Sequence, residues 1–231
     1  MRLNKYIAHC GVGTRRSASE LVKKKEIKVN GQIQDNPAYT VVEGDEVVYK
    51  EKVLIPIKNF EYYLLNKPKG YLTIPKGNKN TRSLFDLITS KSNELMYASD
   101  KMVEEDCGLI LITNDLTLAE KLQDHKTVVK RIFHIHLDKE VSSNLLKKIS
   151  DTNGQKVIVN LSHIRGQKEN EVGVEILKGN VGMLKDIFKA HHLNIQKIDC
   201  TYLHGLTKKD LPRGFSRTLT KDEIILFKHL M

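Results

Sequence analysis

The sequence of 231 residues contains no tryptophan and only three cysteines. Cys10, Cys107 and Cys200 lie 97 and 93 residues apart, which excludes a CxxC metal or redox pair and gives no disulfide framework. Apolar runs such as Leu109–Ile112 are far shorter than the roughly 18 residues of a membrane span. The charged start, Met1–Tyr6, is not followed by a signal-type apolar stretch. We therefore expect an intracellular, reducing, cytoplasmic location and no membrane partner.

Negative charge is also scarce relative to positive charge. The chain has 38 Lys and Arg against 28 Asp and Glu, which gives a net charge of +10. Apolar residues make up 40% and charged residues 29%, an ordinary composition for a globular protein. The positive excess favours a polyanionic partner, with nucleic acid first and an anionic membrane surface second.

Residues 1–50 show two helical patterns followed by short extended runs. Gly11-Val12-Gly13 forms a turn between the helical patterns, and Thr14 is a plausible N-cap of the second helix. The expected elements are helices at 3–10 and 14–22 and strands at 27–31 and 46–49. We predict a small domain of two helices and a small sheet over 1–50, and a linker at 51–60.

Residues 61–231 contain more strand patterns than helix patterns. The expected strands lie at 62–65, 108–113, 131–137, 156–161, 171–177 and 195–203, and the expected helices at 83–88, 116–123, 141–149, 181–191 and 221–230. Strands and helices do not alternate strictly. This order favours an α+β fold with a mostly antiparallel central sheet over a doubly wound fold.

The strongest local charge signal is in the first thirty residues. Eight bases there stand against two acids, Glu20 and Glu26. Arg15 and Arg16 lie at a predicted helix N-terminus, where backbone N–H groups and the helix dipole already favour a phosphate. The alternative interpretation of these bases is a solvated helix face.

A family resemblance supports the phosphate-binding interpretation. The runs Leu3-Asn4-Lys5-Tyr6-Ile7-Ala8, Arg15-Arg16-Ser17-Ala18, Lys28-Val29-Asn30-Gly31 and Gly44-Asp45-Glu46-Val47 occur in this order, with Gly11 between the first two. They resemble the RNA-binding domain first known from ribosomal small-subunit protein four. The resemblance implies that structured RNA is contacted by residues of this segment: Asn4, Lys5, Arg15, Arg16, Ser17, Lys23, Lys24, Lys25, Lys28 and Asn30.

The rest of the chain extends the resemblance. Three motifs carry it: Leu65-Asn66-Lys67-Pro68-Lys69-Gly70, Gly108-Leu109-Ile110-Leu111-Ile112-Thr113-Asn114-Asp115, and Asp210-Leu211-Pro212-Arg213-Gly214 with Arg217, Leu219 and Thr220. They resemble the bacterial ribosomal-RNA pseudouridine synthases of the RsuA/RluB type, which carry the same N-terminal module. The resemblance implies a pseudouridine synthase-like domain over 61–231, a chemistry without cofactors, and ribosomal RNA or ribosomal particles as partners.

The active-site motif of that family is altered in this chain. The family carries Gly-Arg-Leu-Asp-x-x-Thr-Ser-Gly-Leu, whose aspartate is the essential catalytic group. Anchoring the motif on Gly108-Leu109 places Val103 in the aspartate position and Lys101 in the arginine position. Valine has no lone pair and no charge, so it can neither attack the sugar nor transfer a proton. Lysine keeps the charge of arginine but lacks its planar fork.

Two further family positions are altered. Phe133 stands where the family has a tyrosine, and Gly182 where the resemblance places an arginine that pairs with the catalytic aspartate. Lys185 is the only base left in that helix entry. The acids of 100–106, above all Asp100 and Asp106, are weak substitutes for the lost carboxylate, because catalytic geometry is sensitive to about an ångström. We expect them to be solvated loop acids.

The remaining candidates give weaker signals. His134 and His136 alternate on one predicted strand, but no third ligand with supporting spacing is evident, so we expect no metal site. Lys67, Lys69, Lys76 and Lys79, in a loop with Tyr71, form a second basic patch that is a candidate RNA contact. Gly11-Val12-Gly13 lacks the third glycine of a dinucleotide fingerprint.

The sequence therefore supports three functional hypotheses. The favoured one is a ribosomal-RNA-binding protein on a pseudouridine synthase scaffold, catalytically inactive, monomeric, and acting on ribosomal particles or their assembly. The alternative is an active ribosomal-RNA pseudouridine synthase that uses a non-standard acidic residue. The third is a scaffold reused for contact with a protein or another ligand.

Overall fold

The computed structural model describes residues 1–57, 59–73, 82–90, 94–152 and 157–230. They form two compact units, one built mainly from Met1–Glu61 and the other from most of the chain after Tyr62. Each unit contains its own sheet. Among the described residues, no helix has the length and apolar character needed to cross a membrane.

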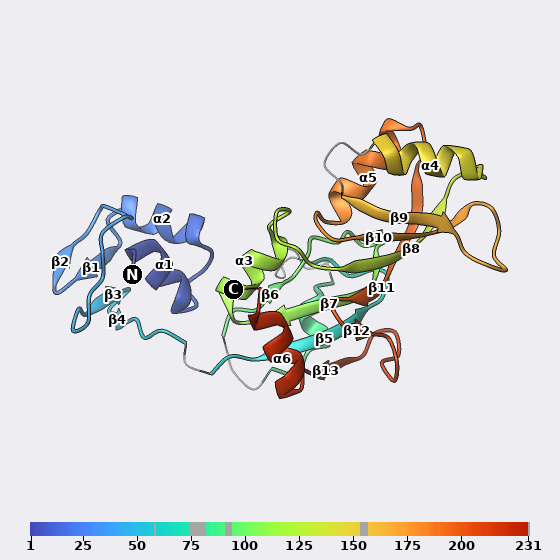
Figure 1. Cartoon of the computed structure of the whole chain (residues 1–231). Coiled ribbons are helices and arrows are strands. Elements are labelled where there is room, and N and C mark those ends of the chain that lie inside the picture. Colours follow the sequence, from blue (N-terminus) through green and yellow to red (C-terminus); the bar gives the residue numbers. More distant parts are fainter. Residues whose placement is uncertain (58, 74–81, 91–93, 153–156, 231) are drawn as a thin grey trace. The chain divides into compact units, whose positions relative to one another are not determined.

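The first unit packs two helices against a small sheet (Figure 1). Its helices are α1 (Leu3–His9) and α2 (Arg15–Lys23), and its strands are β1 (Ile27–Val29), β2 (Gln32–Ile33), β3 (Val47–Tyr49) and β4 (Lys52–Val53), in the order β2-β1-β3-β4. Thr14 caps α2, because its side chain accepts a hydrogen bond from the Ser17 N–H at 3.2 Å. The predicted linker at 51–60 is therefore partly wrong, since β4 lies in it and pairs with β3.

The second unit has a mostly antiparallel sheet, which confirms the predicted fold class. The order of its strands is β13-β5-β7-β11-β8-β10-β9, with β6 paired to β7 and β12 to β11. The β7–β11 pair is parallel. The strands are β5 (Tyr62–Lys67), β6 (Tyr97–Ala98), β7 (Cys107–Thr113), β8 (Arg131–Leu137), β9 (Ile158–His163), β10 (Glu171–Ile176), β11 (Ile195–Leu203), β12 (Leu206–Thr207) and β13 (Ser216–Thr218).

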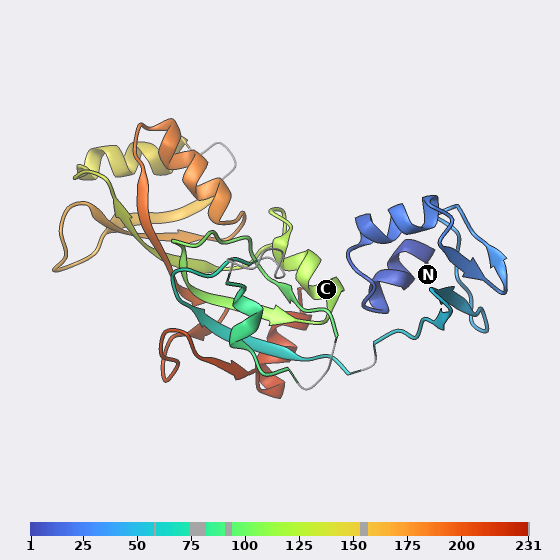
Figure 2. The same cartoon turned by 180° about the vertical axis from the view of Figure 1, so that it is seen from behind.

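One half of this sheet has two different faces. Along β8 the residues alternate, so that Phe133 and Ile135 are buried while His134 and His136 are partly exposed. Figure 2 shows α4 (Ser143–Thr152) and α5 (Val181–Ala190) lying against one side of β8, β9 and β10. Leu184 and Phe188 of α5 are buried, so the apolar face of β8 is the covered one. The face that carries the histidines stays accessible.

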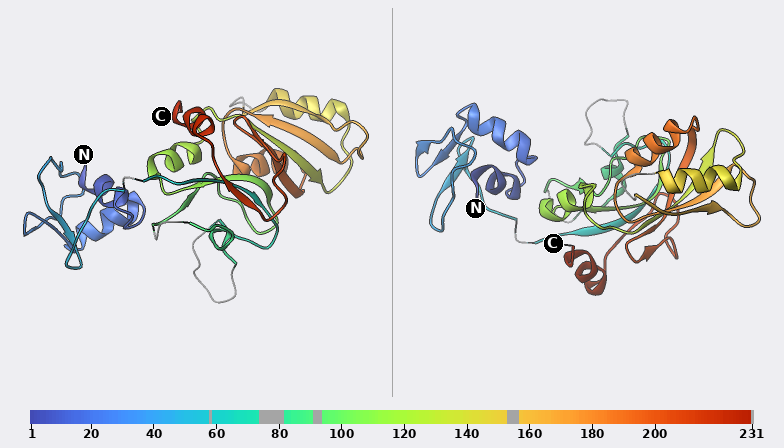
Figure 3. Two further views of the ribbon diagram at one scale, coloured as in Figure 1. Left: turned by 90° about the horizontal axis from the view of Figure 1, so that it is seen from below. Right: turned by 45° about the horizontal axis from the view of Figure 1, so that its top comes forward.

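The other half of the sheet is followed by the C-terminal helix. Figure 3 shows α6 (Lys221–Lys228) on the side of the β5–β13 half, away from α4. A capping box starts α6, because Thr220 and Glu223 each accept a hydrogen bond from the other's backbone N–H. The remaining helices are α3 (Leu116–Gln123) and the single 3₁₀ turn η1 (Leu84–Leu87), which replaces the helix expected at 83–88.

Candidate functional site

The loop between β6 and β7 holds the residues where the family resemblance places the catalytic motif, and a tight turn closes this loop. The Asp106 N–H donates to the Val103 carbonyl at 3.2 Å. The Val103 N–H donates in return to Oδ2 of Asp106 at 2.9 Å. Val103 itself is 46% exposed, so its side chain does not fill the interior. The loop therefore directs the valine toward solvent and the following aspartate inward.

The Asp106 carboxylate is buried in an ion pair with α5. Its side chain is 3% exposed, and Nζ of Lys185 lies 2.7 and 2.9 Å from its two oxygens. Lys185 and the Val103 N–H therefore both donate to the Asp106 carboxylate, so each of its oxygens accepts at least one hydrogen bond. The prediction that the acids of 100–106 are solvated is thus wrong for Asp106, although Glu104 and Glu105 are exposed. The base and the acid lie 79 residues apart in sequence, so no local pattern reveals this pair.

Lys67, at the end of β5, donates hydrogen bonds to the backbone of the same loop. Its side chain is fully buried, and its Nζ donates to the carbonyls of Val103 at 2.9 Å and Asp106 at 2.6 Å. Burial lowers the pKa of this ammonium, against the attraction of nearby acids including Asp106. Because its ammonium is used inside the protein, we leave Lys67 out of the RNA-contacting residues. Lys69 is exposed, and Lys76 and Lys79 lie outside the described residues.

Asp100 is the second buried acid of the loop, again contrary to expectation. It accepts the Lys101 N–H at 2.7 Å. Burial raises the pKa of its carboxyl, and the charge of Arg131 opposes this shift. Arg131 is itself fixed by the carbonyls of Gly179 at 2.9 Å and Leu122 at 2.8 Å. Asp100 thus belongs to the interior next to Arg131, whereas Lys101 is exposed.

Most of the basic residues predicted to contact RNA lie on α2, directly after it, or on β1. Arg16, Lys23, Lys24, Lys25 and Lys28 are exposed on and after α2. Arg15 begins α2 and is partly exposed, as is Lys5 on α1. These cations face solvent, and Lys28 also lies 3.6 Å from the carboxylate of Glu51.

The polar candidates of this segment have structural partners. Asn4 donates to Ser19 Oγ at 3.0 Å, and Ser17 Oγ donates to the Thr14 carbonyl at 2.9 Å. Asn30 has a positive φ of 52° in a turn, where it donates to Asp45 at 2.8 Å. These side chains shape the backbone that presents the bases.

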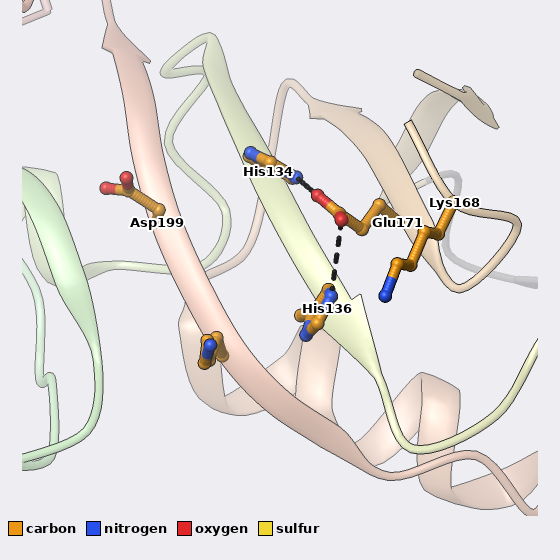
Figure 4. Close-up of a pocket in the computed structure, with 6 residues that line it drawn as sticks. His134, His136, Lys168, Glu171 and Asp199 are labelled. Atoms are coloured by element: carbon orange, nitrogen blue, oxygen red, sulfur yellow. Dashed lines mark hydrogen bonds and ion pairs between the residues drawn. The ribbon is translucent and has the colours of Figure 1, made fainter. Parts of the chain in front are cut away.

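A pocket of about 410 Å³ opens on the accessible face of β8, β10 and β11. The residues that line it are His134, His136, Lys168, Glu171, Lys197 and Asp199. In Figure 4 the two imidazoles lie on either side of the Glu171 carboxylate, at 2.8 Å for His134 and 3.3 Å for His136. In the part of the chain that the structure describes, no three His, Cys, Asp or Glu side chains are grouped to hold a metal ion.

The chain is similar to known proteins over its whole length. The family model of the S4 domain matches residues 1–47. An Aquifex aeolicus protein named as an uncharacterized RNA pseudouridine synthase is 29% identical over 100% of this chain and 98% of its own length. The ribosomal large subunit pseudouridine synthase B of Bacillus subtilis is 25% identical, covering 96% of this chain and 93% of that protein. Over its whole length the chain is similar to RNA pseudouridine synthases of the RsuA/RluB type.

Two further comparisons agree with this family. The ribosomal small subunit pseudouridine synthase A of Vibrio parahaemolyticus is 23% identical over 97% of this chain and 98% of its own length. A crystal structure of a pseudouridylate synthase covers 98% of this chain and 99% of its own, with a TM-score of 0.64 and 20% identity. That structural likeness shows the shared fold.

In this RNA pseudouridine synthase homologue, Phe133 and Gly182 are two other positions at which the sequence departs from the family motif. Phe133 is fully buried on the helix-covered face of β8. Gly182 is exposed in the first turn of α5, after the N-cap Asn180, whose side chain accepts the Met183 N–H at 3.0 Å. The cation that reaches the loop from α5 is Lys185, one turn further along. An acid–base pair therefore persists beside the motif, between residues other than Val103 and Gly182.

Proposed function

We propose that this protein binds ribosomal RNA and acts on ribosomal particles or their assembly without isomerising uridine. The observation that carries the proposal is the exposed Val103 at the aspartate position, in front of a carboxylate whose oxygens are both engaged. Breaking a glycosidic bond through an enzyme carboxylate requires a free oxygen within contact of the nucleoside. Asp106 is 3% exposed and held by Lys185, so it offers no such oxygen.

RNA binding is supported by the first unit, in which most of the basic side chains face solvent, whereas Asp106 is buried. The S4 domain keeps its exposed bases on and after α2, where they remain accessible to phosphates. The relatives with a named substrate act on the large or the small ribosomal subunit, which supports ribosomal RNA as the ligand. We propose that the exposed bases of this segment contact ribosomal RNA, together with Lys69 of the second unit.

The second candidate function is an active ribosomal-RNA pseudouridine synthase that uses Asp106. It is favoured by the Asp106–Lys185 pair, because a buried carboxylate beside a cation is the arrangement expected of the family's active site. This function requires the turn 103–106 to open, so that Asp106 exchanges the Val103 N–H for the substrate.

One assay separates the two candidates. Ribosomal RNA and ribosomal subunits carrying tritium at uridine C5 are incubated with the full-length protein, and tritium release is measured. We expect no release above background, together with retention of the RNA. Release that disappears in Asp106→Asn, while that variant still folds and binds RNA, would establish the second candidate. Release that persists in both Asp106→Asn and Asp100→Asn identifies a contaminating enzyme, which repurification removes before the measurement is repeated.

A further inference from the structure

The pocket on the accessible sheet face has no part in either candidate function. It lies on the face of β8 that carries His134, whereas Phe133 and the helix α5 with Lys185 belong to the other face. We propose that this pocket binds one nucleotide of a single-stranded RNA segment, as a second RNA contact that rests on the proposed RNA-binding function. The phosphate meets Lys168 and Lys197, and the base lies against the imidazoles of His134 and His136.

The charge of the pocket suits a phosphodiester. Lys168 and Lys197 are exposed at its edge. The carboxylate of Asp199 is already paired, with Arg213 at 2.7 Å and with Lys208. Burial acts to raise the pKa of Asp199, but hydrogen bonds from these two cations bring it below its ordinary value. Counting only lysine, arginine, aspartate and glutamate, the lining residues and these two partners carry four positive and two negative charges. The surplus favours an anion at the lysines.

The interior of the pocket suits a base. The side chains of His134 and His136 are 37% and 26% exposed, so part of each ring is open to a ligand. Imidazole rings are among the side chains on which unpaired RNA bases stack. The Glu171 carboxylate between them has about four acceptor sites and two of these face the histidines, so it can still accept from a base N–H. A volume of about 410 Å³ lies in the range of small-ligand sites.

The backbone around the pocket is consistent with a ligand on this face. In register, His134 lies opposite Asp199 of β11 on one side and Gly173 of β10 on the other. Gly173 has no side chain above the sheet next to His134, and a Cβ at this position would make only ordinary contacts, the nearest with Ile164 at 3.7 Å. An acidic peptide is less well matched, because it has no ring to stack and would meet both Glu171 and Asp199.

Binding of a fluorescent twelve-residue oligouridylate to the full-length protein tests the proposal. The variant Lys168→Ala/Lys197→Ala is compared with Lys147→Ala/Lys189→Ala, which removes two exposed lysines from α4 and α5 on the other face. We expect weaker binding in the pocket variant only, with its salt slope reduced by about 0.7 for the loss of one single-strand phosphate contact. His134→Ala is expected to weaken binding about fivefold or more through lost stacking.

A cross-linking measurement on the unchanged protein avoids any folding defect of a variant. An oligomer containing 4-thiouridine is irradiated with the protein, and we expect the cross-linked peptides to include 131–137 or 195–203. Competition by polyglutamate as strong as that by RNA would indicate an acidic-peptide site and overturn the proposal. Equal binding by the pocket and control variants, or no cross-link to either peptide, would also overturn it.

A further variant distinguishes failure of the pocket proposal from failure of the proposed ribosomal-RNA binding. The triple variant Arg15→Ala/Arg16→Ala/Lys24→Ala is assayed on ribosomal RNA beside the pocket variants. If only the triple variant loses affinity, the ribosomal-RNA function stands and the pocket proposal fails. If the unchanged protein does not bind ribosomal RNA, the proposed function itself fails.

Discussion

At the scale of single residues, the main feature of the loop is where its carboxylate lies: at Asp106 and not at Val103. Val103 and Asp106 are three residues apart, yet one is half-exposed and the other is buried against Lys185. The sequence alone predicts that Val103 replaces the family's aspartate. It does not predict the buried ion pair of Asp106, because the partner Lys185 lies on a helix 79 residues further along the chain.

Restoring the family's aspartate at this residue is not expected to restore activity. In Val103→Asp the new carboxylate lacks a free cation, since Lys185 already binds Asp106, and Phe133 lacks the hydroxyl of the family's tyrosine. The measurement is tritium release from ribosomal RNA labelled at uridine C5, with the unchanged protein as control. Turnover by this variant would mean that the rest of the cleft is functional.

The Asp106–Lys185 pair is expected to contribute to the stability of the second unit. Lys185→Met leaves a buried carboxylate without its cation, and we expect it to lose about 1–3 kcal/mol of unfolding free energy. Asp106→Leu/Lys185→Met removes both charges and is expected to recover part of that loss. Urea denaturation of the two single variants and the double variant gives the coupling energy. A coupling near zero would show that solvent screens the pair.

At the scale of elements, β7 and β11 approach each other so closely that only glycine fits at Gly108. Its φ is +105°, and a Cβ there would collide with the backbone N and O of Cys200. We expect Gly108→Ala to destabilise the protein by about 2–4 kcal/mol. Gly166→Ala is the matched control, because Gly166 also has a positive φ, +79°, but lies in open space. Thermal unfolding measures both, and equal losses would mean that strain, rather than the collision, sets the cost.

The link between β11 and the chain after β12 is expected to weaken in acid. Burial acts to raise the pKa of Asp199, but the hydrogen bonds of Arg213 and Lys208 bring it below its ordinary value. A pKa that is lower in the folded state gives stability that is fully present above the unfolded pKa of about 3.9 and lost as the pH falls through the folded value. In Asp199→Asn this part of the acid-induced loss is expected to disappear. Urea denaturation between pH 2 and 6 gives the unfolding free energy of the unchanged protein and of Asp199→Asn. If the two free energies fall in parallel as the pH is lowered, Asp199 is not the group responsible.

Local patterns predict the long elements well and the short ones poorly. The residues of β8 alternate in character over seven positions, and α3 and β11 were expected at the bounds they have. The two-residue strands β2, β4, β6 and β12 were not predicted, because a strand of that length is defined by its partner. The contact of Glu171 with His134 and His136 was missed for the same reason, since it depends on the register of β10 against β8.

Burial of charge is the other feature that local patterns miss. Lys67 resembles a loop lysine in the sequence, within Asn66-Lys67-Pro68-Lys69-Gly70. In the structure it ends β5 and is fully buried. Its partners are backbone carbonyls of Val103 and Asp106, which carry no sequence signal. Three-dimensional placement therefore decides which of the basic residues remain available to RNA.

At the scale of the whole molecule, a net charge of +10 is useful to an RNA-binding protein only where the cations face solvent. The S4 segment meets this condition, because Arg16, Lys23, Lys24, Lys25 and Lys28 are exposed. Binding through such cations releases counterions from the RNA and therefore depends on salt.

The S4 surface is expected to supply most of the salt dependence of RNA binding. For Arg15→Ala/Arg16→Ala/Lys24→Ala, loss of three duplex phosphate contacts lowers the slope of log K against log salt by about 2.7. Lys121→Ala/Lys147→Ala/Lys189→Ala removes the same charge from α3, α4 and α5 of the second unit and serves as control. Filter binding to ribosomal RNA at several salt concentrations measures both slopes. Because the two variants have the same net charge, equal slopes would show that total charge, rather than the S4 surface, drives binding.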